Sequence, residues 1–224
     1  MNEKKLALLV DGENIAPEFA EEILHKAGTL GIVSVRIVYG EFRRTTTPPW
    51  QSPVVKALGF DLCRVKRAFR CSNSTDEAIC RAAKRLVRRG TAEAVCIVSA
   101  DGDFAALAEE LIAEGNPCFG IGPNDASKKL KSSCSEFLCL GDSSPVSGPI
   151  RKQQIRVLRV AVTAHANKNG WAKIQAVEDY LQIHSTLYRQ QRWGFASISE
   201  VFMATNQFEL QDFPDNQYRV RHIA

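Results

Sequence analysis

Four aspartates that are far apart in the sequence stand beside predicted strands and helices, in positions where they could meet: Asp11, Asp76, Asp101 and Asp103. Carboxylates brought close together repel one another and raise one another's pKa unless a cation neutralises them. Mg²⁺ or Mn²⁺ suits such a group, because hard cations prefer oxygen ligands. An ion held beside a phosphodiester can activate water and neutralise charge in the transition state. These residues therefore support Mg²⁺- or Mn²⁺-dependent phosphodiester hydrolysis.

Polar residues next to two of the aspartates could tune such a site. Asn14, three residues after Asp11, could orient a metal-bound water or a carboxylate, and Ser99 could hydrogen-bond an acid or a phosphate. Each aspartate also has a purely structural interpretation, since Asp commonly caps a helix, completes a turn or complements the helix dipole. The joint pattern of Asp11–Asn14 with Ser99–Phe104 favours a metal site.

Apolar runs alternate with helical patterns through residues 1–140, and this alternation is expected to position the acids. Short apolar runs predict strands over Leu6–Val10, Val33–Val38 and residues 60–65, 95–98, 117–121 and 137–140. Helical spacing predicts helices over residues 17–30, 51–58, 75–89, 103–114 and 126–132. This order is typical of an α/β three-layer sandwich with a mostly parallel sheet and crossover helices on both faces. Ligands bind beyond the carboxyl ends of such strands, so the aspartates are expected to converge there.

The small residues, glycines and prolines of residues 141–149 predict a linker between two domains. After it, the pattern predicts helices near 150–166, 172–182 and 196–204, then strands at 207–211 and 217–221 around a turn at Phe213–Asn216. Three helices and a terminal hairpin indicate a small winged-helix-like domain over 150–224.

The composition argues against a membrane or secreted protein and allows a nucleic-acid partner. The chain has 224 residues, 45% of them hydrophobic and 24% charged, and no apolar run approaches the ~18–20 residues of a membrane helix. The N-terminus has no signal-peptide pattern, and the seven cysteines form no CxxC pair, so free thiols in a reducing cytoplasm are expected. Residues 1–149 hold 19 basic and 19 acidic residues, whereas residues 150–224 hold 10 and 6. This basic excess permits a nucleic-acid partner. No oligomeric state is predicted.

Basic residues flank the expected acidic edge and could bind the phosphates of a nucleic acid. The candidates are Arg43, Arg44, Arg64, Lys66, Arg67, Arg70 and Lys128. Trp50 or Phe69 could stack on a base. The alternative is that these charges only solvate loops. Four basic residues in the last turns of helix 75–89 are instead interpreted as compensating the negative end of the helix dipole: Lys84, Arg85, Arg88 and Arg89.

The first domain resembles the NYN domain of LabA-like proteins, the former DUF88 group. The resemblance rests on Leu6–Asn14, the helix-opening Asp76, Ser99–Phe104, and the later segments Leu111–Gly115, Gly120–Gly122 and Ser133–Phe137. It implies a PIN-like fold and a metal-dependent ribonuclease. Metal-binding roles would then belong to Asp11, Asp76 and Asp101, with Asp103 supporting them and Asn14 at the family's polar position. The family often has Asp where this chain has Ser135, which could remove one contact to metal or substrate.

The second domain resembles the OST-HTH or LOTUS domain over about residues 152–222. The resemblance rests on Asn169–Ala172, Trp193–Phe202 and Thr205–Leu210. It implies RNA binding, with protein partners in some members. Aromatic residues are expected to fill its core: Trp171, Phe195, Phe202 and Phe208. Candidate phosphate contacts are Arg151, Lys152, Arg156, Arg159, Arg189 and Arg192, of which Arg156 and Arg159 share a helix face.

The first functional hypothesis is a cytoplasmic ribonuclease that hydrolyses RNA with Mg²⁺ or Mn²⁺ and recruits it through its C-terminal domain. Two other classes stay open. A non-catalytic RNA-binding or adaptor protein would use the aspartates only as helix caps or weak metal ligands. A hydrolase of small phosphoesters could share the sheet, although Glu13 stands where a phospho-aspartyl phosphatase needs a second Asp.

Overall fold

The computed structural model describes residues 4–42, 50–65, 74–141, 150–213 and 217–223. Contacts divide the chain into two compact units, one of residues 1–51 with 59–142 and one of residues 52–58 with 143–224. The short helix α2 (Pro53–Ala57), capped by the Ser52 hydroxyl, groups with the second unit. Apart from Gly141, the predicted linker 141–149 lies outside the described residues, as do the turn residues 214–216.

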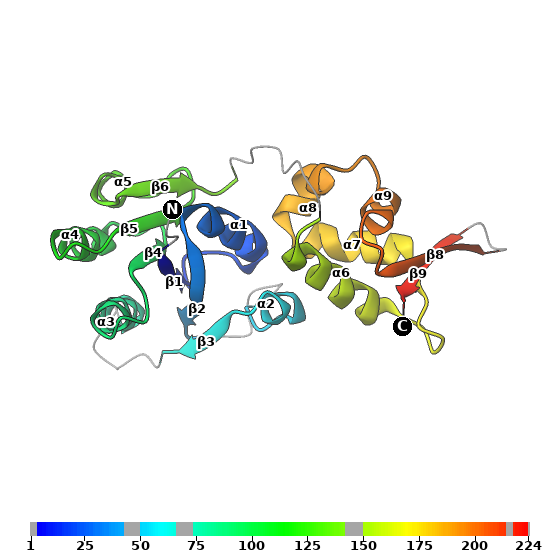
Figure 1. Ribbon diagram of the computed structural model, residues 1–224, viewed down its shortest axis with the longest axis horizontal. Helices are drawn as coiled ribbons and strands as arrows, with labels where there is room; N and C mark the ends of the chain where they lie inside the picture. The colour runs from blue at the N-terminus through cyan, green and yellow to red at the C-terminus, as the bar shows by residue number, and fades with distance from the viewer. Residues whose placement is uncertain (1–3, 43–49, 66–73, 142–149, 214–216, 224) are drawn as a thin grey trace. The chain divides into compact units, whose positions relative to one another are not determined.

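The first unit contains a six-stranded sheet in which every paired strand is parallel, in the order β3-β2-β1-β4-β5-β6 (Figure 1). The predicted α/β class is confirmed. The strands are β1 (Lys5–Asp11), β2 (Ile32–Gly40), β3 (Asp61–Arg64), β4 (Ala94–Val98), β5 (Cys118–Gly122) and β6 (Glu136–Cys139). Their helices are α1 (Ala20–Leu30), α3 (Ser74–Arg88), α4 (Ala105–Ala113) and α5 (Lys128–Ser133), with 3₁₀ turns at Pro17–Phe19 and Gly102–Phe104.

Burial explains why the apolar runs became central strands. Residues Leu6–Val10 of β1 and all of β4 are inaccessible to solvent, because helices cover both faces of the sheet. Figure 1 shows α3 and α4 on one face and α1 on the other. The core on the α3 side includes Leu9, Ile79 and Phe104. These layers fix the carboxyl ends of β1 and β4 and the start of α3, which carry the aspartates.

The strand order reverses between β1 and β4. From β1 the sheet grows outward through β2 to β3, and from β4 it grows in the opposite direction to β6. Val10 pairs with Val38 on one side and with Val98 on the other, so Asp11 and Ser99 follow neighbouring strand ends. This is the topological switch point at which open parallel sheets place their ligand sites.

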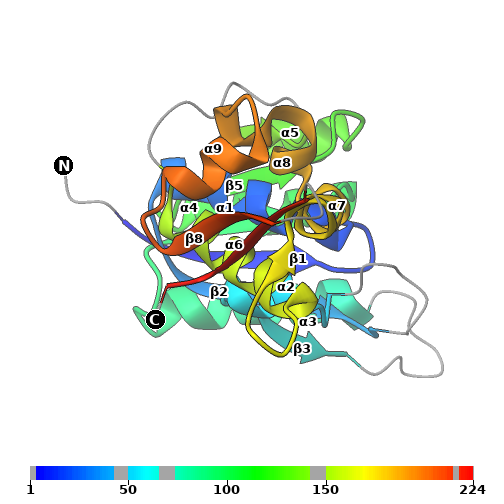
Figure 2. The same cartoon turned by 90° about the vertical axis from the view of Figure 1, so that its right-hand side faces the viewer.

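The second unit contains helices and a small antiparallel sheet, seen from the side in Figure 2. Its elements are α6 (Lys152–His165), α7 (Ile174–His184), α8 (Thr186–Gln191), a 3₁₀ turn (Arg192–Gly194), α9 (Ile198–Met203), β7 (Ala172–Lys173), β8 (Phe208–Phe213) and β9 (Gln217–His222). The predicted hairpin is confirmed as β8–β9, with β7 added in the order β7-β9-β8. Helix α8 and strand β7 were not predicted.

Aromatic side chains form much of the core of the second unit. Trp171, Phe202 and Phe208 are buried as predicted, but Phe195 is only half-buried. Trp193 lies in the interior instead, 1% exposed and edge-to-face with Tyr188 at 5.2 Å between ring centroids. The backbone at Trp193 is in the left-handed region, with a φ of 54°.

Within the described ranges, no helix has the length and apolar character needed to cross a membrane. The six described cysteines are free thiols, and Cys96 and Cys118 are buried. Burial raises the pKa of both thiols, so they act as small apolar core residues.

Candidate metal centre

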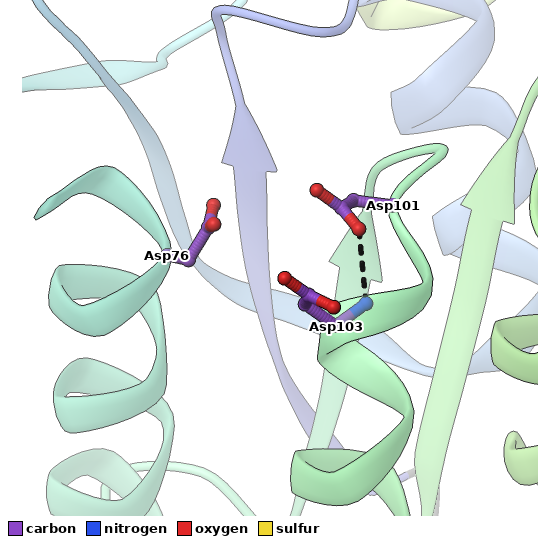
Figure 3. A group of neighbouring side chains, drawn as sticks. All are labelled: Asp76, Asp101 and Asp103. Atoms are coloured by element: carbon purple, nitrogen blue, oxygen red, sulfur yellow. Dashed lines mark hydrogen bonds between the residues drawn. The ribbon is translucent and has the colours of Figure 1, made fainter. Parts of the chain in front are cut away.

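Three aspartates meet beyond the carboxyl ends of the strands. One carboxylate oxygen from each of Asp76, Asp101 and Asp103 lies within 4.8 Å of the other two. Figure 3 shows Asp76 reaching from the first turn of α3 toward the two others, which stand on the loop and 3₁₀ turn after β4. Asp76 and Asp101 are half-buried, and Asp103 is exposed. The structure thus brings together acids separated by about 25 residues in the sequence.

The loop after β4 holds two of these carboxylates through its own hydrogen bonds. Asp101 caps the 3₁₀ turn, its Oδ1 accepting from the backbone N–H of Asp103 at 2.9 Å (Figure 3). The backbone N–H of Asp101 donates to the Ser99 hydroxyl at 3.1 Å. Asp101 therefore has the structural role of a helix cap and also belongs to the acidic cluster.

Asp11 lies deeper at the same edge, 1% exposed, and is not one of the three clustered acids. Its Oδ2 accepts from the Asn14 side-chain amide at 2.6 Å and from the Ser99 hydroxyl at 2.9 Å. Its Oδ1 accepts from the backbone N–H of Glu13 at 3.2 Å. Asn14 thus orients a carboxylate, one of its two predicted roles. Direct metal binding by Asp11 stays a prediction.

The surroundings of Asp76 raise the pKa of its carboxyl group. Desolvation, followed by the negative charges of Asp11, Asp101, Asp103 and Glu13, raises the pKa of Asp76 from 3.8 to about 6. In the described part of the chain, no lysine or arginine forms an ion pair with any of the three clustered acids. A group of three carboxylates that has no ion pair with these described cations fits a hard divalent cation, which prefers oxygen ligands. Sequence reasoning missed the contribution of Glu13, although it stands two residues from Asp11.

The loop after β1 is fixed by a glycine and a buried tryptophan. A Cβ on Gly12 would lie 2.7 Å from Cγ1 of Val38, so only glycine fits there. Trp50 is 3% exposed, and its indole N–H is shared between the carbonyls of Gly12 (3.2 Å) and Ile15 (3.1 Å). The expectation that Trp50 stacks on a base is therefore wrong. Phe69, the other stacking candidate, lies outside the described residues.

The loop after β5 packs against the loop after β4, which carries Asp101 and Asp103. The backbone N–H of Ser127 donates to the carbonyl of Ala100 at 3.0 Å, and a Cβ on Gly102 would lie 2.6 Å from the Ser127 hydroxyl oxygen. A Cβ on Gly122 would lie 2.4 Å from the carbonyl oxygen of Ser99. These glycines are needed for close approach between the loops that follow β4 and β5, a role that the sequence alone does not reveal.

Two predicted phosphate contacts of the first unit are described, and both lie at the acidic edge. Arg64 ends β3, and Lys128 begins α5 just after the loop that follows β5; both side chains are exposed. Five others lie outside the described residues: Arg43, Arg44, Lys66, Arg67 and Arg70. Their role in substrate binding stays a prediction.

In the second unit, Arg156 and Arg159 are exposed on α6, as their spacing predicts. The guanidinium of Arg159 donates to the side-chain carbonyl of Gln207 at 2.9 Å. Arg192, another candidate, pairs with Glu178 at 3.1 Å. Of these arginines, Arg156 is the one for which the structure gives no protein partner among the described residues.

Ser135 lies at the opposite edge of the sheet. It precedes β6, and its backbone N–H donates to the carbonyl of Cys118, the first residue of β5, at 2.7 Å. An acid at this position would stand at the amino ends of the strands, away from Asp76 and Asp101. The serine therefore leaves the acidic cluster intact.

A parallel sheet with carboxylates at its switch point is the arrangement of PIN-like, nuclease-type α/β domains. The family model of the NYN domain matches residues 5–141, and the chain belongs to this family. A protein of unknown function from Vibrio parahaemolyticus RIMD 2210633 has a similar fold, with a TM-score of 0.51 and 20% identity over 63% of this chain and 95% of its own. No curated protein matches this chain significantly.

Family membership and the acidic cluster together support a nuclease-like function, divalent-metal use and RNA as a bound substrate. The family match ends at residue 141, so the resemblance of the second unit to an OST-HTH domain stays a prediction.

Proposed function

We propose that the protein is a divalent-metal-dependent ribonuclease that hydrolyses RNA phosphodiester bonds at the edge carrying Asp76, Asp101 and Asp103. The observation that carries the proposal is the approach of these three carboxylates to within 4.8 Å, where α3 meets the loop after β4. A protein with no use for a cation would gain stability by replacing one of these acids, since no lysine or arginine in the described ranges pairs with them to offset their mutual repulsion.

The residues of the site divide into three groups with different tasks in this proposal. Asp76, Asp101 and Asp103 would hold Mg²⁺ or Mn²⁺, and a bound ion would supply activation of water and neutralisation of charge on the phosphate. The buried Asp11 adds negative charge near the cluster, and hydrogen bonds from Asn14 and Ser99 hold its carboxylate in place. Exposed Arg64 and Lys128 stand at the same edge and would contact phosphates of the substrate.

The second unit would recruit RNA, as its resemblance to OST-HTH domains implies and its surplus of basic residues allows. Exposed Arg156 and Arg159 on α6 are candidate phosphate contacts, and a protein partner is the alternative ligand. Free thiols suit a cytoplasmic protein.

A specific observation favours a second candidate function. Asp101 caps a 3₁₀ turn, and the carboxylate of Asp11 accepts hydrogen bonds from Asn14, Ser99 and the backbone N–H of Glu13. These are structural roles that a non-catalytic RNA-binding or adaptor protein would also need.

Cleavage of labelled single-stranded RNA by the full chain, with Mn²⁺ or Mg²⁺ and with EDTA, separates the two functions. Asn is as good a helix cap as Asp, so Asp101→Asn keeps the turn and removes only the charge. Asp61→Asn is the matched control, because Asp61 is exposed at the start of β3, at the opposite edge of the sheet.

The ribonuclease proposal predicts that Asp101→Asn lowers the rate of metal-dependent cleavage by at least about 10²-fold, whereas Asp61→Asn cleaves like the wild type. Wild-type protein that binds RNA and cleaves none with either ion would instead establish the adaptor function.

A further inference from the structure

Helix α3 carries a strongly basic groove on its surface. The groove has a volume of about 620 Å³, and the described residues that line it are all basic: Arg81, Lys84, Arg85, Arg88 and Arg89. The four arginines are exposed, and Lys84 is half-buried and paired with Glu110 of α4 at 2.6 Å. No ion pair of the arginines is found among the described residues. We call this surface the α3 groove.

The positions of these side chains make a continuous row. Residue 81, the pair 84 and 85, and the pair 88 and 89 recur every three to four residues, so a cation stands on each turn, about 5.4 Å apart along the axis. The buried residues of the helix, such as Ile79 and Ala82, face the sheet. The row is therefore a feature of the outer side of the helix.

Compensation of the helix dipole, the role assigned to these residues from the sequence, explains only part of the row. The dipole acts within the last turn, which holds Arg85 and Arg88. Arg81 and Lys84 lie before that turn. Like charges four residues apart destabilise a helix, and two such pairs lie within α3: 81 with 85, and 84 with 88. An anion bound along the row would offset this repulsion.

The residues that line the groove indicate what kind of polyanion it binds. Four of the five described lining residues are arginines, whose planar guanidinium pairs with phosphate through two hydrogen bonds, and none of these five is aromatic or acidic. Such a surface contacts a backbone of phosphates and does not stack bases, so it would not discriminate between sequences. The same helix carries Asp76 of the acidic cluster in its first turn.

We infer that the α3 groove anchors the phosphate backbone of a single-stranded RNA whose scissile bond lies at the acidic cluster. The inference rests on the ribonuclease proposal for its choice of polyanion. At 1.5 Å per residue, the row begins about 7 Å and ends about 20 Å along the helix axis from Asp76. A stacked strand rises about 3.4 Å per nucleotide, so RNA must extend about six nucleotides from the scissile bond to fill the groove.

Binding is measured with the full chain in EDTA, so that the result does not depend on cleavage. The probe is a labelled 20-nucleotide single-stranded RNA, titrated at several salt concentrations. Arg85→Gln with Arg88→Gln removes two charges from the row, and Lys4→Gln with Lys5→Gln removes two exposed charges from the beginning of β1, where neither residue lines the groove. Thermal unfolding of each variant shows whether the fold is kept.

The inference predicts a loss of about 5-fold in affinity for each lost contact at 0.1 M salt, and about 25-fold for the α3 double variant. The slope of log affinity against log salt falls by about 1.4 in that variant. A ribodinucleotide is too short to reach the groove, so the α3 double variant should cleave it with Mn²⁺ at the wild-type rate. The Lys4 and Lys5 double variant binds the 20-mer almost as the wild type does.

Equal losses in the two double variants, or wild-type binding by the α3 variant, would overturn the inference and leave the ribonuclease proposal standing. Binding of polyglutamate as tightly as RNA would also overturn it and would assign the groove to acidic proteins. Groove-dependent RNA binding without cleavage under any divalent ion would support the groove and refute the ribonuclease.

Discussion

Replacement of Asp76 by asparagine should make the metal-free protein more stable at neutral and alkaline pH. The pKa of Asp76 is raised from 3.8 to about 6, first by desolvation and then by its acidic neighbours. A carboxyl group whose pKa is higher in the folded state stabilises the fold when protonated. That stability is present below about pH 4 and is lost as the pH rises through about 6. Asparagine keeps the shape of the side chain and carries no charge.

The size of the effect follows from the two pKa values. Their separation corresponds to about 3 kcal/mol at 1.36 kcal/mol for each pH unit. Because Asp76 is only half-buried, solvent screening reduces this to about 1–2 kcal/mol. Loss of a favourable charge in the first turn of α3 offsets a few tenths of a kcal/mol. We expect Asp76→Asn to unfold about 2–4 °C above the wild type at pH 8 in EDTA.

Thermal unfolding followed by circular dichroism at pH 4 and pH 8 in EDTA measures this difference, with Asp61→Asn as the control. The advantage of Asp76→Asn should vanish at pH 4, where Asp76 of the wild type is protonated. Saturating Mn²⁺ at pH 8 should reverse the order, because only the wild type retains the full ligand set. A variant that is no more stable than the wild type at pH 8 in EDTA would refute the reasoning.

Three further substitutions test how the site is held. Ser99→Ala removes a buried hydrogen bond to Asp11 and should lower the free energy of unfolding by about 1–3 kcal/mol in urea denaturation. Trp50→Phe removes the indole donor to the carbonyl of Gly12 and should cost about 1–3 kcal/mol, with cleavage reduced, whereas a base-stacking role would leave stability unchanged. Gly122→Ala places a methyl group 2.4 Å from the carbonyl oxygen of Ser99 and should cost about 1–3 kcal/mol; wild-type stability there would show that the loops can separate freely.

The central strands were predictable because burial on both faces leaves a continuous apolar run. Leu6–Val10 and the residues of β4 are such runs, and each lies within a strand of the structure. Helix α8 was missed because it has only six residues, too few to show helical periodicity. Its cap, Ser185, which accepts from the backbone N–H of Tyr188 at 3.1 Å, was the available signal.

The sequence predicted that the acids lie at one edge of the sheet. It did not predict which of them are buried and which form the cluster. Strand ends and helix starts place Asp11, Asp76 and Asp101 at the switch point on topology alone. Which of the acids bring their carboxylates together depends on side-chain hydrogen bonds. The bonds of Ser99 and Asn14 hold Asp11 below the surface, and Asp103 stands beside Asp101. Pattern and spacing carry no information about those bonds.

Calorimetric titration of the full chain with Mn²⁺ tests most directly whether the acidic cluster is a metal site. We predict saturable binding by the wild type and by Asp61→Asn, and a loss of about tenfold or more in Asp103→Asn, since Asp103 is exposed and its removal leaves the core intact. Absence of binding by the wild type at millimolar Mn²⁺, or equal affinity in Asp103→Asn, would contradict the account.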